Sequence, residues 1–260
     1  MVDTVLLSAG QNNLDAVCQL ADEFQVGIEL MHFAFPEVLD APTSDTIARV
    51  KRALAGRDVP LSIHGPFYDM ATGSVDEAVN ALCRRRFTQA IEAADAVGAR
   101  RMVVHANFIA TIRNDYYRVG WHQRNVDFWG DFASTADRLG VSVLIENMWE
   151  YEPQIIAKLL KDIDHPLLGA CLDVGHAAIF SDPGITIQHW LDSMSPWLTH
   201  FHLNDNNGKI DEHHGFDYVD GVLDYHEILP KLRQVTHPTW MVLEMDSVDD
   251  MRASLPYFAL

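Results

Sequence analysis

Hydrophobic residues along this chain gather into short runs, and longer segments with a helical period separate the runs. Short apolar runs bounded by polar residues are typical of parallel strands covered on both faces. Eight such runs occur, at residues 5–7, 27–31, 61–63, 101–104, 142–145, 170–172, 198–201 and 240–243. This alternation predicts an α/β fold, a (β/α)8 TIM barrel that forms a single domain over residues 1–260. The competing open sheet is disfavoured because no G-x-G-x-x-G follows the first run.

Two of the helical segments show recognisable ends. Ser74 and Glu77 have the spacing of a capping box, which predicts a helix that begins after Ser74 and ends at Gly98. A second apolar periodicity runs from Val126 to Leu139, and Gly140 is expected to end it.

Charge and composition exclude several classes of protein. The chain has 19 Lys and Arg against 37 Asp and Glu, a formal charge of -18, which opposes binding to nucleic acid. No apolar stretch approaches the roughly 20 residues that cross a bilayer, and no basic leader precedes one. The widely spaced Cys18, Cys83 and Cys171 indicate buried, reduced thiols. We therefore expect a cytoplasmic protein without a membrane partner.

Six of the predicted strands end in a histidine or an acidic residue. These residues are His64, His105, Glu146, Asp173, His202 and Glu244, and His176 follows Asp173 by three positions. Because the active sites of TIM barrels form at the carboxyl ends of the strands, the six side chains are expected to converge. Buried carboxylates need a compensating charge, and mixed carboxylate and imidazole ligands suit Mn, Zn, Co or Mg. The pattern predicts a divalent metal.

A polar loop after the seventh run carries further candidate ligands. Asp211 and His213 are two positions apart, so they share a side if this segment is extended. A solvated polar turn is the alternative interpretation, but the position of the loop beside His202 favours a site.

Several short motifs together resemble the xylose isomerase-like TIM-barrel superfamily. They match in order along nearly the whole chain, as His64-Gly65-Pro66-Phe67, Glu146-Asn147, Asp173-Val174-Gly175-His176, His202-Leu203-Asn204-Asp205 and Glu244. That superfamily contains sugar and sugar-phosphate isomerases and epimerases, and also endonuclease IV, an AP endonuclease of family 2.

For the isomerase and epimerase branch, the resemblance implies one divalent ion held by Glu146, Asp173, His202 and Glu244. Glu146 and Glu244 would also be the catalytic base and acid, and His176 would contact the substrate oxygen. The metal would stabilise the enediolate that forms when a proton leaves the carbon beside a carbonyl. Three aromatic residues follow strand ends closely and are expected to form an apolar wall for substrate binding, namely Phe67, Phe108 and Trp149. Glu29 is expected to support the site by hydrogen bonding inside the barrel.

For the endonuclease branch, the resemblance implies three zinc ions. Their ligands would be the same four residues together with additional metal-site candidates, which are His64, His105, His176, Asp211 and His213. The charge of -18 disfavours that branch, and the loop that follows His64 resembles the sugar-type members. The chain departs from the ketohexose 3-epimerases, which have an Arg shortly after the seventh-strand histidine, where this chain has Gly208-Lys209.

The sequence therefore predicts a divalent-metal-dependent isomerase or epimerase acting on a small-molecule sugar or sugar phosphate. Alternatives are a zinc-dependent phosphodiesterase like endonuclease IV, a related metal-dependent lyase or dehydratase, and a non-catalytic sugar-binding barrel. Metal stoichiometry separates the phosphodiesterase from the rest, and solvent-deuterium exchange beside the carbonyl identifies the non-catalytic barrel by its absence. Related barrels often pair, so a homo-oligomer stays open.

Overall fold

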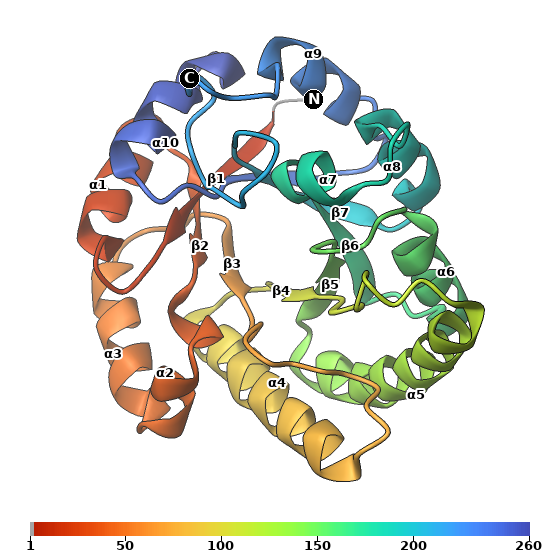
Figure 1. The fold of residues 1–260 in the computed structure, drawn as a ribbon. Coiled ribbons are helices and arrows are strands. Elements are labelled where there is room, and N and C mark those ends of the chain that lie inside the picture. The colour runs from red at the N-terminus through yellow and green to blue at the C-terminus, as the bar shows by residue number, and fades with distance from the viewer. Residues whose placement is uncertain (1–2) are drawn as a thin grey trace.

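Eight parallel strands pair in chain order, and the last strand pairs with the first to close a barrel (Figure 1). The computed structural model describes residues 3–260. Each predicted apolar run overlaps one strand, so the TIM-barrel prediction is confirmed. The strands are β1 (Thr4–Ala9), β2 (Gly27–Leu30), β3 (Leu61–His64), β4 (Arg101–His105), β5 (Ser142–Glu146), β6 (Leu168–Asp173), β7 (Leu198–Leu203) and β8 (Trp240–Leu243).

Helices surround these strands as an outer ring (Figure 1). The α-helices are α1 (Leu14–Phe24), α2 (Pro36–Asp40), α3 (Thr43–Ala53), α4 (Glu77–Val97), α5 (Asp115–Leu139), α6 (Gln154–Ile163), α7 (Val174–Phe180), α8 (Ile187–Met194), α9 (Tyr225–Leu232) and α10 (Val248–Ser254). Short 3-10 helices are η1 (His32–Ala34) and η2 (Leu255–Phe258). Within the described part of the chain, no helix combines the length and apolar character needed to span a membrane.

Alternation along each strand separates the barrel interior from the layer beneath the helices, because successive side chains point to opposite faces. Val103, Leu144 and Cys171 form a small buried group of their own, apart from the main core. Each of them stands two residues before a strand-end polar residue, so both members of each pair face the same way. These polar residues are His105, Glu146 and Asp173. The strands therefore direct the polar side chains into the barrel mouth, above an apolar floor.

The helix ends agree only in part with the expectations. Gly98 and Gly140 end α4 and α5 with φ of 90° and 63°, as predicted. The capping box at Ser74 is wrong, because Asp76 is the residue that caps α4, accepting from the Ala78 amide at 2.8 Å. Ser74 instead accepts from the amide of Asp76 at 3.1 Å. A carboxylate directly before the helix satisfies an amide of the first turn and displaces the serine from that role. Cys18, Cys83 and Cys171 are free and buried, as expected.

Two glycines provide a test of packing in this barrel. A Cβ at Gly27 would lie 2.5 Å from the carbonyl oxygen of Pro60, whereas a Cβ at Gly130, inside α5, would meet nothing within 4 Å. Gly27→Ala should therefore lower the free energy of unfolding by about 1–3 kcal/mol. Gly130→Ala should raise it by about 0.5–1 kcal/mol, because alanine favours the helix. Urea unfolding measures both, and equal midpoints for the two variants would contradict this account of the packing.

Candidate metal centre

The carboxyl ends of the strands surround a cavity of about 380 Å³, here called the mouth cavity. Strand ends and the loops that follow them supply its lining. The lining residues are Met31, His64, Phe67, Tyr68, Asp69, His105, Asn107, Met148, Trp149, His176, Asp211, His213 and Glu244. Glu146, Asp173 and His202 are fully buried and contact this lining from below.

His202 on β7 lies between two of the carboxylates that were predicted to bind metal. Its Nδ1 is 3.1 Å from Oε1 of Glu146 and 2.9 Å from Oε2 of Glu244. Its Nε2 is 2.8 Å from Oε1 of Glu29. Burial opposes a charged ring, but these carboxylates hold the pKa of His202 well above its usual range. Since Nδ1 carries at most one proton, it cannot donate to both glutamates at once.

Asp173 is held rigidly at the end of β6. Its Oδ1 caps α7 by accepting from the His176 amide at 2.5 Å, and its Oδ2 accepts from the side chain of Asn204 at 3.0 Å. The side chain of Asn147 exchanges two hydrogen bonds of 2.9 Å with the main chain of Asp173. Gly175 must lack a side chain here, because a Cβ would lie 1.9 Å from Oδ1 of Asn204. Burial raises the pKa of Asp173 to about 6, and the neighbouring glutamates add to this rise.

His64 and His105 face the other oxygen of Glu146. Their Nε2 atoms lie 3.3 and 3.4 Å from Oε2 of that residue. The two imidazole rings meet edge to face with centroids 5.1 Å apart, and Phe67 packs against both at 5.2 Å. Glu146 is thus enclosed by imidazoles on both of its oxygens.

The loop between β7 and α9 brings a further group to the mouth. Oδ1 of Asp211 lies 3.3 Å from Nε2 of His176 and 3.3 Å from Nε2 of His213. Main-chain hydrogen bonds between Asp205 and His214 return this loop to the barrel. The alternation that placed Asp211 and His213 on one side is therefore observed. Burial opposes it, but the Asp211 carboxylate raises the pKa of His213 to about 9.

The donor atoms of this centre fit a divalent cation. Oε2 of Glu146, Oε2 of Glu244 and Nε2 of His176 are buried and have no hydrogen-bond partner among residues 3–260. Three groups offer ligand atoms that lie within 4.8 Å of one another, and they are His64 with His202 and Glu244, His64 with His105 and Glu146, and His176 with Asp211 and His213. Carboxylate oxygens and imidazole nitrogens are suitable ligands for Mn, Zn, Co and Mg.

The three aromatic residues expected to form a wall have separate positions. Phe67 and Trp149 line the mouth cavity, and Trp149 is 41% exposed. Phe108 does not line it. Its ring is buried outside the mouth, with centroids 5.1 Å from Tyr117 and 5.2 Å from Trp121. The preceding Asn107 has a left-handed φ of 55°, and this turn directs Phe108 toward α5.

Glu29 supports His202 from inside the barrel, as expected. Its Oε2 accepts from the Ser62 hydroxyl at 2.7 Å and lies 2.9 Å from Nε2 of His200. His200 was not singled out from the sequence. Its position two residues before His202 on the same strand was the available signal, because alternate residues share a face.

Glu150 is a second residue that sequence reasoning missed. Its buried carboxylate accepts from the amide of Met148 at 2.7 Å and from the amide of Phe108 at 3.1 Å. It therefore joins the β4–α5 loop to the β5–α6 loop, both of which line the mouth cavity. Burial raises the pKa of Glu150 to about 7.

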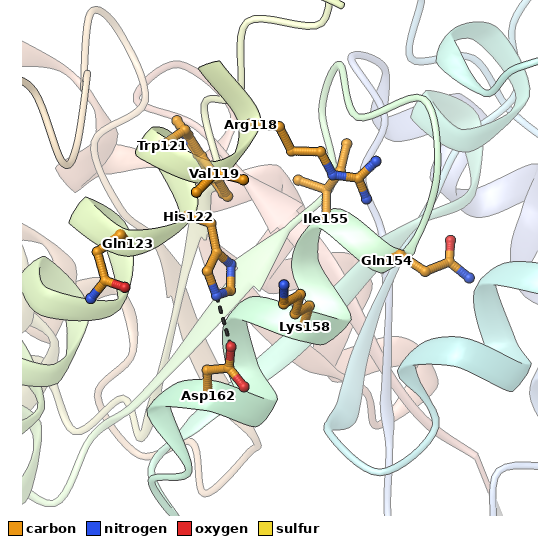
Figure 2. Close-up of a pocket in the computed structure, with 9 residues that line it drawn as sticks. All are labelled: Arg118, Val119, Trp121, His122, Gln123, Gln154, Ile155, Lys158 and Asp162. Carbon is orange, nitrogen blue, oxygen red and sulfur yellow. Dashed lines mark hydrogen bonds and ion pairs between the residues drawn. The ribbon is translucent and has the colours of Figure 1, made fainter. Parts of the chain in front are cut away.

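A smaller pocket of about 280 Å³ lies outside the barrel, between α5 and α6 (Figure 2). Figure 2 shows His122 of α5 pointing at Asp162 of α6, with Nε2 and Oδ2 2.8 Å apart. Arg118 at its rim pairs with Glu152. The predicted site residues are absent from its lining, and two of its charged groups are already paired. We therefore assign the chemistry to the mouth cavity.

A parallel barrel with carboxylates and imidazoles gathered at its mouth defines the class of this protein as a TIM barrel with a polar site at the strand ends. The chain belongs to the xylose isomerase-like TIM barrel family, whose model matches residues 24–259.

Similar proteins agree with this family. The TTHB071 protein from Thermus thermophilus, in a structure obtained after soaking with ZnCl2, is 26% identical with a TM-score of 0.79, covering 98% of this chain and 96% of that chain. A D-tagatose 3-epimerase-like protein is 22% identical with a TM-score of 0.79, covering 98% and 97%. The uncharacterised protein MJ1311 of Methanocaldococcus jannaschii is 27% identical over 199 residues, which are 74% of this chain and 67% of that protein.

The raised pKa of Glu150 predicts a pH-dependent contribution to stability. The folded chain keeps this carboxyl protonated up to about pH 7, whereas the unfolded chain loses the proton near its ordinary value of 4.5. The contribution is therefore greatest below pH 4.5 and is lost as the pH rises to about 7. Its size is about 3 kcal/mol. Glu150→Gln should remove this part of the pH dependence.

Urea unfolding of chelator-treated protein at pH 5 and pH 8 measures the effect as a difference between the two pH values. Glu227→Gln, at an exposed position of α9, is the matched control and should behave as the wild type. An unchanged pH dependence in Glu150→Gln would show that the folded carboxyl titrates normally.

Proposed function

We propose that this protein is a divalent-metal-dependent isomerase or epimerase of a sugar or sugar derivative. The observation that carries the proposal is the pair of glutamates, Glu146 and Glu244, that face one nitrogen of His202 at 3.1 and 2.9 Å. Two carboxylates from opposite sides of the barrel meet at the closed end of a cavity large enough for a sugar.

Four residues would hold the metal, and they are Glu146, Asp173, His202 and Glu244. When bound, the ion would polarise a substrate carbonyl and so acidify the neighbouring C–H bond. The contacts behind these residues favour the arrangement. Glu29 fixes the ring of His202 through Nε2, which leaves Nδ1 to face the two glutamates.

Glu244 is the better placed of the two glutamates to remove the proton. It lines the mouth cavity, so its Oε2 can receive a proton from the carbon beside the carbonyl. The C–H bonding pair moves toward the carbonyl carbon, and the carbonyl oxygen takes up the negative charge. Glu146 then returns a proton, either to the other face of that carbon or to its neighbour. His176 lines the same cavity and would orient the substrate oxygen.

The fold comparisons support a sugar substrate. Structures with this fold include a D-psicose 3-epimerase studied in the presence of D-fructose, with a TM-score of 0.70, and a D-allulose 3-epimerase in complex with D-allulose, with a TM-score of 0.71. Their identities to this chain are 17% and 13%, so the support is that of a shared barrel.

A zinc-dependent phosphodiesterase is the second candidate. Two ligand groups beside the proposed centre favour it, because a single ion does not need them. These groups are His64 with His105 and Glu146, and His176 with Asp211 and His213. Against it stands the charge of -18, which opposes a nucleic-acid backbone.

Removing either glutamate should abolish turnover. Glu244→Gln and Glu146→Gln keep the side-chain shape but lose a proton acceptor and a charged ligand, so Mn²⁺ affinity should fall as well. We expect proton exchange in deuterated buffer to fall by roughly 10²–10⁴-fold across a panel of ketoses, aldoses and their phosphates. NMR measures the exchange and calorimetry the metal affinity. Glu227→Gln is the control, and undiminished exchange in Glu244→Gln would refute the proposed role.

Metal content separates the two candidates. Under the proposed function, Asp211→Asn should retain one tightly bound divalent ion per chain, because Asp211 lies outside the four-residue set. Elemental analysis of the wild type and this variant measures the content. Three zinc ions in the wild type, fewer in Asp211→Asn, and cleavage of a duplex with an abasic site would favour the phosphodiesterase instead.

A further inference from the structure

A second cavity of about 410 Å³ adjoins the mouth cavity, and we call it the side cavity. It lies between the β3–α4 loop and the start of α5. The two cavities share four lining residues, which are Phe67, Asp69, Asn107 and Trp149. A ligand seated at the metal centre can therefore extend past Trp149 into the side cavity without leaving the protein surface.

The walls of the side cavity are mainly apolar. Met70 and Ala71 lie on the β3–α4 loop, and Ile109, Tyr117 and Trp121 face them from the β4–α5 loop and α5. Ile109 is 49% exposed, which is unusual for a large apolar side chain unless a ligand covers it.

The main basic group of this cavity is already engaged. Arg124 lines it, but its Nε donates to the carbonyl of Gly73. The acidic Asp69 at the boundary gives the cavity a charge of mixed sign. An anionic group such as a phosphate therefore finds no free cluster of cations here, whereas a neutral apolar group fits the walls.

Buried hydrogen bonds hold this cavity in shape. The fully buried Asn125 of α5 accepts from the Thr72 hydroxyl at 2.7 Å and donates to the carbonyl of Trp121 at 2.9 Å. The side chain of Asn107 donates to the carbonyl of Met70 at 2.9 Å. A ligand entering a preformed cavity loses little free energy to ordering the loops.

We propose that the side cavity is a subsite for an aromatic substituent on the sugar, so that the substrate is a glycoside or similar conjugate with a ring-sized aglycone. This inference rests on the proposed function, which seats the sugar in the mouth cavity. At about 380 Å³, that cavity already has the size of a complete small-ligand site, and the side cavity is left for a second group. Aromatic walls at Trp149 and Tyr117 suit the flat face of such a group.

The test compares matched ligands on the Mn²⁺-loaded protein. Phenyl and methyl glycosides of glucose, galactose, mannose and xylose are titrated by calorimetry. At least one phenyl glycoside should bind about tenfold or more tightly than its methyl counterpart, because only the phenyl ring enters the side cavity. If no phenyl glycoside binds more tightly than its methyl counterpart, the subsite is refuted.

Three variants locate the effect. Ala71→Trp should fill the side cavity and remove the preference for phenyl, and Ile109→Asp should weaken it by placing a charge in the wall. Both positions are exposed, so the fold should tolerate them. Ala253→Trp, at an exposed position of α10, is the matched control and should keep the preference. A preference that survives both cavity variants would also overturn the proposal.

Proton exchange distinguishes this inference from the proposed function. Metal-dependent exchange on free sugars without any phenyl preference would leave the isomerase proposal standing and refute the subsite. A phenyl preference that Ala71→Trp removes, without exchange on any sugar in the panel, would support the subsite and refute the isomerase.

Discussion

Buried negative charge is the constraint on which the mouth of this barrel depends. Glu29, Glu146, Asp173 and Glu244 are all at most 5% exposed, and carboxylates in such a place must be protonated or compensated. Imidazoles provide part of the compensation, and His202 alone faces three of these carboxylates. A divalent ion would supply more positive charge than one imidazolium and would relieve the competition of two glutamates for the single proton on Nδ1.

The strands explain why so much of this centre could be predicted from the sequence. A parallel barrel brings every strand end to one rim, so a polar residue that follows an apolar run can be placed without knowing the loops. The register confirms the reasoning, since His105 pairs with Glu146 and Asp173 pairs with His202 across neighbouring strands. Asp211 and His213 were placed by the alternation of an extended segment, which is also a local rule.

Features that depend on contacts between loops could not be predicted. Phe108 follows a strand end as closely as Phe67 does, yet the left-handed turn at Asn107 sends it toward α5. Glu150 looks like an ordinary surface residue in the sequence, and only the approach of two loops buries it. The cap of α4 was missed for a different reason, because Ser74 and Asp76 both suit that role and the choice depends on where the helix begins.

The division between strands and loops also bears on substrate choice. The residues proposed to hold the metal and move the proton stand at the ends of β5, β6, β7 and β8. The side cavity, by contrast, is built from the β3–α4 and β4–α5 loops and the start of α5. Loops tolerate change better than strands, and in TIM barrels they carry much of the specificity. A barrel of this kind can therefore keep one proton-transfer centre while the opposite side of its mouth adapts to what the sugar carries. Trp149 stands at the boundary, on the loop that follows Glu146, and is in a position to couple the two halves.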